Sequence, residues 1–225
     1  MSLSSLLETF EQLAPMLASG LITTLQVTIT SLVIAMALGI FVCLMHISKK
    51  KVLRGIAKFY IWIIRGTPML VQAFYIYFAV PQLIQLSTGS SFRIDVYTAS
   101  LITLSLNAGA YISEIFRGSI ESVDKGQMEA SRSLGVSYAT SMRKIILPQA
   151  VRICLPSLVN QCIITLKDST ILYAIGLSEI MYQAKIYVGR TMESFATYTW
   201  VAICFLLITS VLMLVSRSIE KRMHS

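Results

Sequence analysis

Charged side chains are scarce in this sequence. Asp, Glu, Lys and Arg together make up 13% of its 225 residues, whereas apolar residues make up 55%. A soluble domain carries about 25% charged residues, so the surface of a water-soluble enzyme cannot be built from this composition. Disorder is excluded as well, because disordered segments are poor in apolar residues.

Other motifs are missing too. The four cysteines form no Cys-X-X-Cys pair, and the two histidines lie far apart in the chain. This pattern supports neither a disulfide scaffold nor a metal site. No Gly-x-x-x-x-Gly-Lys-Ser/Thr segment occurs, so the chain has no phosphate loop with which to bind nucleotide. No catalytic residues are predicted.

The few charges leave long apolar stretches between them. A helix that crosses a bilayer needs roughly 20 apolar residues. Five stretches qualify, namely 20–46, 59–83, 96–116, 151–175 and 195–216. The sequence therefore predicts an all-α polytopic membrane protein with five transmembrane helices, its membrane domain covering residues 19–216.

Basic residues predict the orientation of these helices. If the first helix runs from outside to inside, one side of the membrane holds Lys49, Lys50, Lys51, Arg54, Lys58, Arg117, Lys125, Arg132, Arg143, Lys144, Arg152, Arg217, Lys221 and Arg222. The other side holds only Arg93, Lys185 and Arg190. The positive-inside rule places the basic side in the cytoplasm. The N-terminus is then outside, and residues 217–225 form a basic cytoplasmic tail. The net charge of +8 follows from this topology and gives no support to nucleic-acid binding.

Two short amphipathic segments are predicted on the outer side. In residues 1–18, apolar side chains recur at helical spacing opposite Glu8 and Glu11, which is typical of a helix lying on the membrane surface. We expect Pro15 to end that helix. Residues 177–188 show a similar pattern. They form either a docking surface for a partner or an interfacial helix without one.

A hydrophilic stretch, residues 121–149, faces the cytoplasm. Residues 127–134 are predicted to form a short helix, with Gly135 as a left-handed cap after it. Ser137 is a candidate N-cap for a second helix, and Pro148 suits the first turn of the long helix that follows. A rigid helix–turn–helix here can transmit force. The alternative is a solvated loop without a mechanical role.

The same stretch carries a family resemblance. Glu129-Ala130-Ser131, then Gly135, then nine residues to Ile145-Ile146-Leu147-Pro148, resembles the EAA loop of ABC importer permeases, with Ser131 in place of the usual Ala. Arg65-Gly66-Thr67-Pro68 followed by Met69-Leu70-Val71-Gln72 resembles the second-span motif of the polar amino acid permeases. Gly109-Ala110-Tyr111, Glu114, Arg117-Gly118, Lys125-Gly126-Gln127 and Lys167-Asp168-Ser169 resemble later motifs of that subfamily.

The resemblance implies a type I ABC importer permease in a bacterial cytoplasmic membrane, taking up a polar amino acid by alternating access. Its implied partners are two ATPase subunits that use Mg-ATP, a second permease chain (a copy or a paralogue) and an extracytoplasmic binding protein. It also implies that residues 127–135 are the coupling helix that docks on the ATPase, through Gln127, Glu129, Ala130, Ser131, Leu134 and Gly135. Glu129 would be its polar anchor. The chain itself would need no cofactor.

Polar residues within the predicted spans are candidates for substrate contact. On the fourth span, Gln161 and Asp168 lie seven residues apart and share a face, with Thr165 and Asn160 beside them. A charged residue at a helix centre costs about 2.5–3.5 kcal/mol on insertion scales, so we expect this polar strip to have polar partners. It either binds an amino acid or makes polar contacts with neighbouring helices or subunits. Lys167 is expected to pair with a helix C-terminus or an acidic residue.

The resemblance implies that relatives which carry basic amino acids often have Glu at the position of Gln161. The neutral amide here favours a neutral polar cargo, such as glutamine or cystine, over arginine or lysine.

The second span adds Thr67 and Gln72 beside a break at Gly66 and Pro68. Arg65 pairs across helices with Glu114, or Glu114 pairs locally with Arg117.

A second class of function is compatible with these data, namely a self-standing carrier or channel for amino acids. The odd number of spans and the absence of a visible inverted repeat weaken that interpretation.

Overall fold

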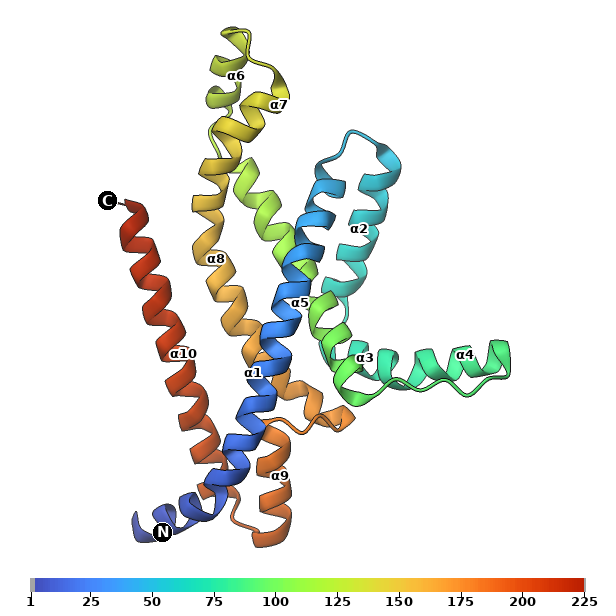
Figure 1. The fold of residues 1–225 in the computed structure, drawn as a ribbon, viewed down its shortest axis with the longest axis vertical. Helices are drawn as coiled ribbons and strands as arrows, with labels where there is room; N and C mark the ends of the chain where they lie inside the picture. The colour runs from blue at the N-terminus through green and yellow to red at the C-terminus, as the bar shows by residue number, and fades with distance from the viewer. Residues whose placement is uncertain (1–2, 225) are drawn as a thin grey trace.

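The structure, a computed structural model, describes residues 3–224, and all regular elements in that range are helices (Figure 1). In chain order they are α1 (Leu3–Ile47), α2 (Lys51–Gly66), α3 (Met69–Phe74), η1 (Tyr75–Ala79), α4 (Val80–Thr88), α5 (Val96–Glu121), α6 (Lys125–Ser133), α7 (Tyr138–Ser141), η2 (Met142–Ile146), α8 (Leu147–Asp168), η3 (Ser169–Ile175), α9 (Ile180–Thr191) and α10 (Ser194–His224). The segments η1 and η2 are π-helical turns, and η3 is a 3₁₀ helix.

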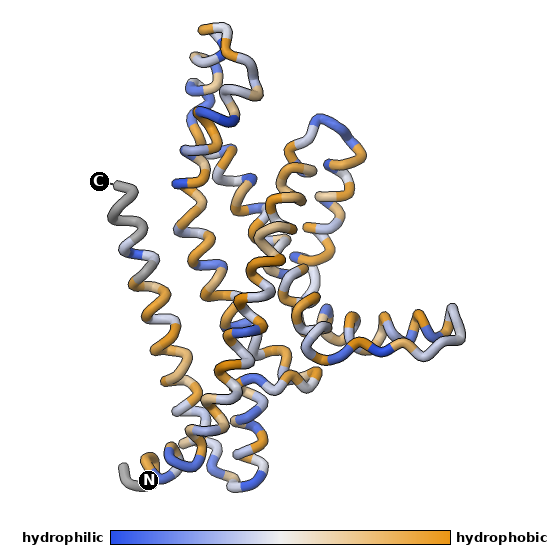
Figure 2. The backbone as a smooth tube through the Cα atoms, in the orientation of Figure 1, coloured by the Kyte–Doolittle hydropathy of each residue, from blue (hydrophilic) through white to orange (hydrophobic). Residues whose placement is uncertain are grey.

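Four helical stretches among the described residues are long and apolar enough to cross a membrane. They are Leu6–Ile47, Met69–Thr88, Tyr138–Ile175 and Ser194–Ser218. The predicted third span coincides with α5, which is long enough at 26 residues but carries many Ser, Thr and small residues. Most of these side chains are buried against other helices, so α5 presents little surface that must be apolar. Figure 2 shows the long apolar stretches and the polar ends of the molecule.

Helices α1 and α5 pack along much of their lengths and form the centre of the bundle. Small residues make this close approach possible. A Cβ atom at Gly39 on α1 would lie 2.5 Å from Cγ2 of Ile112 on α5. Ala35 and Ala108 are buried in the same contact. The α1–α5 pair is thus a fixed frame on which the other helices rest.

The second predicted span is broken, as Gly66 and Pro68 predict. Helix α2 ends at Gly66, Thr67 and Pro68 are extended, and α3 begins at Met69. Pro68 has no N–H with which to continue the helix. Figure 1 shows that α2 runs back alongside α1, whereas α3 and α4 turn sideways out of the bundle.

Two π-helical turns each lie just before a proline. In η1 the N–H of Val80 bonds the carbonyl of Tyr75, and Pro81 follows. In η2 the N–H of Leu147 bonds the carbonyl of Met142, and Pro148 follows in the first turn of α8, as predicted. A proline clashes with the carbonyl four residues earlier, and a widened turn relieves this crowding. Tyr138–Ile175 is therefore one continuous helical stretch that begins in the loop and ends with η3.

The prediction that Pro15 ends a helix is wrong, because α1 continues through it to Ile47. Contacts on the N-terminal side hold the segment in place. The indole N–H of Trp200 on α10 donates to the carbonyl of Leu6 at 3.0 Å. The ring centroids of Phe10 and Trp200 lie 4.4 Å apart, and Leu13 is fully buried.

The N-terminal segment thus packs on the bundle rather than only on a membrane surface. Residues 1–2, within the predicted segment 1–18, lie outside the described residues, as does Ser225 of the predicted tail. The backbone of that tail is otherwise a continuation of α10.

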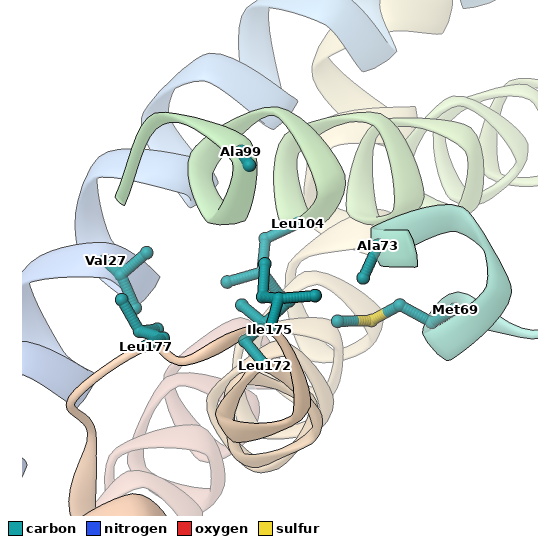
Figure 3. Close-up of a cluster of buried hydrophobic side chains, with 8 residues drawn as sticks. All are labelled: Val27, Met69, Ala73, Ala99, Leu104, Leu172, Ile175 and Leu177. Carbon is teal, nitrogen blue, oxygen red and sulfur yellow. The ribbon is translucent and has the colours of Figure 1, made fainter. Parts of the chain in front are cut away.

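One hydrophobic cluster ties the broken second span to the rest of the bundle (Figure 3). It joins α1, α3, α5 and the segment after α8, through Val27, Met69, Ala73, Ala99, Leu104, Leu172, Ile175 and Leu177. Apolar packing therefore fixes α3 directly after the break, and the orientation of the polar groups beside the break follows from it.

Candidate functional site

The loop after α5 folds into a compact helical hairpin, as predicted. Helix α6 spans Lys125–Ser133, shifted by one or two residues from the predicted 127–134. Its N-cap is Asp124, whose Oδ1 accepts from the N–H of Gly126 at 2.7 Å. A carboxylate at this position satisfies free N–H groups and complements the helix dipole. Lys125–Ser133 is therefore a capped helix rather than an irregular loop.

Gly135 reverses the chain after α6. Its φ is +80°, in the left-handed region that glycine tolerates best. The N–H of Gly135 bonds the carbonyl of Arg132 at 3.0 Å, and that of Val136 bonds the carbonyl of Ser131 at 3.2 Å. These two bonds are those of a Schellman motif. The predicted cap is confirmed.

Two serines join the arms of the hairpin. Ser137 caps α7, as predicted, and accepts from the N–H of Thr140 at 3.3 Å. The Oγ atoms of Ser131 and Ser141 lie 2.6 Å apart and are buried. The hydroxyl of Ser141 also donates to the carbonyl of Ser137. Since a hydroxyl has one proton, Ser131 is the donor of the shared bond, and this bond gives the unusual Ser131 a structural role.

The base of the hairpin is apolar and its tip is exposed. Val123, Ile146 and Ala150 are buried together, with Met128 of α6 packed against them. These contacts fix α6 to the ends of α5 and α8. Leu134, by contrast, is 84% exposed at the tip. Gln127, Glu129 and Ala130 are also exposed. The tip is therefore a rigid surface with an unpartnered leucine.

Gln72 satisfies the backbone at the break in the second span. Its Nε2 donates to the carbonyl oxygens of Ile64 (2.8 Å) and Thr67 (3.0 Å) and to Oγ1 of Thr67 (2.9 Å). Its Oε1 accepts from Nδ2 of Asn107 on α5 at 3.1 Å. Gln72 is only 8% exposed. In this structure the predicted substrate contacts Gln72 and Thr67 thus bond each other, and Asn107 is a partner that sequence reasoning missed.

The groove beside this break is mainly apolar. It has a volume of about 460 Å³ and is lined by Ile63, Ile64, Thr67, Val71, Gln72, Tyr75, Ile76 and Leu106. A free amino acid carries a carboxylate and an ammonium group, and both need polar partners when they are buried. The lining of this groove offers few of them.

Of the predicted polar strip on α8, only Gln161 and Thr165 bond each other. Nε2 of Gln161 lies 3.3 Å from Oγ1 of Thr165, which donates to the carbonyl of Gln161 at 2.9 Å. Both residues are buried, with Gln161 4% exposed. Asp168, at the end of α8, is half-buried, whereas Asn160 and Lys167 are exposed. Gln161 and Thr165 therefore form a pair, and Asn160 does not join it.

Glu114 satisfies both pairings that the sequence left open. Its two oxygens accept from Nε and Nη2 of Arg117, each at 2.9 Å. Its Oε2 also lies 3.5 Å from Nη1 of Arg65 on α2. Nδ1 of His46 on α1 also lies 3.3 Å from Oε1 of Glu114. Sequence reasoning did not identify this neighbour, because only the fold brings the end of α1 beside α5.

Glu179 was not recognised from the sequence. It is fully buried before α9, and its two oxygens accept from the N–H groups of Met181 (2.9 Å) and Tyr182 (2.7 Å). Burial raises the pKa of Glu179 to about 7. An acidic residue just before an apolar helical pattern is an N-cap signal, and it places the start of α9 at Ile180 rather than at the predicted residue 177.

Comparison with known proteins shows the family. Residues 31–225 match the family described as "Binding-protein-dependent transport system inner membrane component". This chain belongs to that family. It is 35% identical over 209 residues to the glutamine transport system permease protein of Escherichia coli (strain K12), covering 93% of both chains. It is also 35% identical over 211 residues to the arginine transport system permease protein of Bacillus subtilis (strain 168), covering 94% of both.

Solved structures agree with this assignment. A chain from a crystal structure of "an amino acid ABC transporter with histidines" is 36% identical, with a TM-score of 0.88, over 95% of this chain and 97% of that one. A chain of an inward-facing methionine ABC transporter is 17% identical with a TM-score of 0.74, a likeness of fold alone. This permease is therefore a transport subunit of an amino acid ABC system and not an enzyme.

Proposed function

We propose that this permease carries a neutral polar amino acid, with glutamine as the first candidate, into the bacterial cytoplasm. An extracytoplasmic binding protein delivers the amino acid, and two cytoplasmic ATPase subunits that use Mg-ATP drive alternating access. The observation that carries the proposal is the rigid α6–α7 hairpin. It combines the EAA motif with an exposed leucine at its tip, in a chain of this transport family.

The proposed topology has five crossings. They are made by α1, the broken unit α2–α4, α5, the continuous unit from α7 to η3, and α10. The lysine-rich turn between α1 and α2, the hairpin and the end of α10 lie toward one end of the molecule, and α9 lies toward the other (Figure 1). The positive-inside rule supports a cytoplasmic position for the first end, in the plasma membrane of a bacterium. The N-terminal segment is then outside, next to α9.

The tip of the hairpin is the proposed contact with the ATPase. Leu134 would enter an apolar pocket of the partner, since an exposed apolar side chain at a rigid tip gains most from burial. Glu129 is exposed on the same helix and would bond basic or N–H groups of the partner. Force applied there passes into α5 and α8 through the buried cluster around Val123 and Ile146.

The neutral amide of Gln161 supports a neutral cargo. Relatives of this chain at nearly equal identity are named for glutamine and for arginine, so overall identity does not choose between the two. A guanidinium prefers a carboxylate partner, and Gln161 offers none. We propose that Gln161, Thr165 and Asp168 line the path of the amino acid. A second permease chain would place two such strips on either side of a twofold axis.

Reconstitution tests the proposal directly. The permease is placed in liposomes with its ATPase and binding protein, and uptake of labelled glutamine is measured with and without ATP. Uptake that requires all three components supports the proposal. Uptake by the permease chain alone, without ATP, would instead identify a self-standing carrier. A tenfold excess of unlabelled arginine that fully suppresses the uptake of glutamine would overturn the proposed selectivity.

A further inference from the structure

Helix α5 contacts both sides of the break in the second span. After the break, Asn107 donates to Gln72. Before the break, the guanidinium of Arg65 lies 5.2 Å from the ring centroid of Tyr111 and 3.5 Å from Glu114. Asn107, Tyr111 and Glu114 are spaced i, i+4 and i+7, so they lie along one face of α5. These three residues are called the hinge stripe below.

The contacts that the hinge stripe makes on the two sides of the break differ in burial and in length. Gln72 is buried and makes four hydrogen bonds, three of them to the ends of the break itself. The ion pair between Arg65 and Glu114 is longer, at 3.5 Å, and the side chain of Arg65 is 43% exposed. An exposed ion pair of this kind contributes little to stability. It can therefore open and close at little cost, while the bonds of Gln72 persist.

The other end of α5 is firmly joined to the hairpin. Within α5 itself, Arg117 bonds Glu114 through two nitrogens and Glu121 at 2.6 Å, which stiffens this end of the helix. Glu121 is the last residue of α5. The next residues lead to the buried Val123, which packs with Met128 of α6. Any movement of α6 is thus passed to α5, and the hinge stripe moves with it.

We propose that the hinge stripe couples the ATPase-driven movement of α6 to the break at Thr67–Pro68, and that Glu114 is its positioning residue. Glu114 holds Arg65, and with it the end of α2, in one state of the transport cycle and releases it in another. This inference rests on the proposed function, because it assumes that α6 is moved by an ATPase. It assigns to Glu114 a role in transmission, with no contact to the amino acid.

The test uses the complete complex in liposomes, with labelled glutamine as the probe. The quantity measured is the number of ATP molecules hydrolysed per glutamine transported. Coupling energies between linked sites commonly correspond to factors of 5 to 150. We expect Glu114→Gln and Arg65→Ala to raise this ratio roughly tenfold, mainly by lowering uptake. Arg65→Lys, which keeps the cation, should restore most of the coupling.

Four further variants separate transmission of movement from an effect on the stability of the subunit. Tyr111→Phe keeps an aromatic face for Arg65 and should behave as wild type, whereas Tyr111→Leu should raise the ratio. Arg54→Ala, an exposed cation at the start of α2, is the control. The double variant Arg65→Ala/Glu114→Gln should raise the ratio by less than the two single effects combined, because the contact between Arg65 and Glu114 is common to both.

The outcomes distinguish transmission of movement by Glu114 from stabilisation of the subunit by Glu114. A wild-type complex that shows no ATP-dependent uptake refutes the proposed function itself. If the wild type works and the Glu114 and Arg65 variants keep the normal ratio, the inference about the hinge stripe is wrong. If uptake and hydrolysis fall in parallel, or if the two substitutions are additive, Glu114 stabilises the subunit without transmitting movement, and the inference is again overturned.

Discussion

The hydroxyl groups of Ser131 and Ser141 lie 2.6 Å apart in the interior of the α6–α7 hairpin. Ser131 stands where EAA-loop permeases usually have Ala, so this bond is an additional link between the arms of the hairpin. Both residues are buried, which shields the bond from competing water. The bond makes the hairpin stiffer at the point where α6 meets α7.

Ser131→Ala should loosen the hairpin slightly without unfolding it. Ser141 keeps its own bond to the carbonyl of Ser137, so no buried donor is left without a partner. The expected loss is about 0.5–1.5 kcal/mol, the usual net value of one hydrogen bond. Hydrogen exchange of residues 125–146 measures it. Ser133→Ala on the exposed face of α6 is the matched control, and equal exchange rates in the two variants would contradict a role for the shared bond.

Gly135→Ala tests the turn of the coupling hairpin. A Cβ at Gly135 would meet no atom within 4 Å, but φ is +80°. The expected cost is therefore conformational, about 1–2 kcal/mol for a left-handed residue with a side chain, and no steric clash adds to it. Gly135→Asn should be milder, because Asn tolerates this conformation. The measurements are hydrogen exchange in the hairpin and co-purification of the ATPase. Normal insertion with loss of the ATPase is expected for Gly135→Asp.

Gln72→Leu should destabilise the break in the second span. It leaves the carbonyl of Ile64 and the amide of Asn107 without their present partners, and each buried unsatisfied group costs about 1–3 kcal/mol. Thermal unfolding in detergent measures this loss. The KM for the amino acid should stay unchanged in the active fraction, because the bonds of Gln72 are to the protein. An increase in KM with normal stability would instead assign Gln72 to substrate binding.

Local signals in the sequence predict the parts of the fold that depend on local physics. Charge-free stretches locate the long helices, and Gly135 and Ser137 locate the caps of the hairpin. Pro15 is a misleading signal, because contacts of Leu6, Phe10 and Leu13 with α9 and α10, far away in the sequence, hold α1 together. Such long-range packing leaves no local signature.

In the candidate site, too, local features can be predicted from the sequence, whereas contacts between distant segments cannot. The sequence associates Gln72 and Thr67 with the break, but the bonds of Gln72 depend on carbonyl groups that only the bend exposes. Glu114 was expected to choose between Arg65 and Arg117, yet it binds both. The sequence gives the spacing along one helix, and it cannot give the distance to α2 or to His46 on α1.

Glu179 should make stability depend on pH. Its pKa rises from 4.5 to about 7 on burial in the folded protein, so the folded state binds the proton more tightly than the unfolded state. The resulting stabilisation is complete below about pH 4.5 and is lost as the pH rises through 7. Unfolding of the α9 region, followed by hydrogen exchange between pH 4.5 and 8, measures this. Glu179→Gln should flatten the profile, whereas Glu11→Gln at an exposed position should not.

The selectivity of the permease should respond to a single carboxylate at position 161. Gln161→Glu places an acid on the face of α8 that holds Thr165 and Asp168, where a guanidinium gains a charge-assisted partner. Hydrogen bonds to charged groups contribute about 1.5–3 kcal/mol, which corresponds to a shift of roughly tenfold to a hundredfold toward arginine over glutamine.

Competition between the two labelled amino acids in the reconstituted complex measures that shift. Gln161→Met, similar in length but without charge, should weaken uptake of glutamine and give no gain for arginine. If the Glu and Met variants have the same preference between arginine and glutamine, position 161 serves helix packing and does not contact the amino acid.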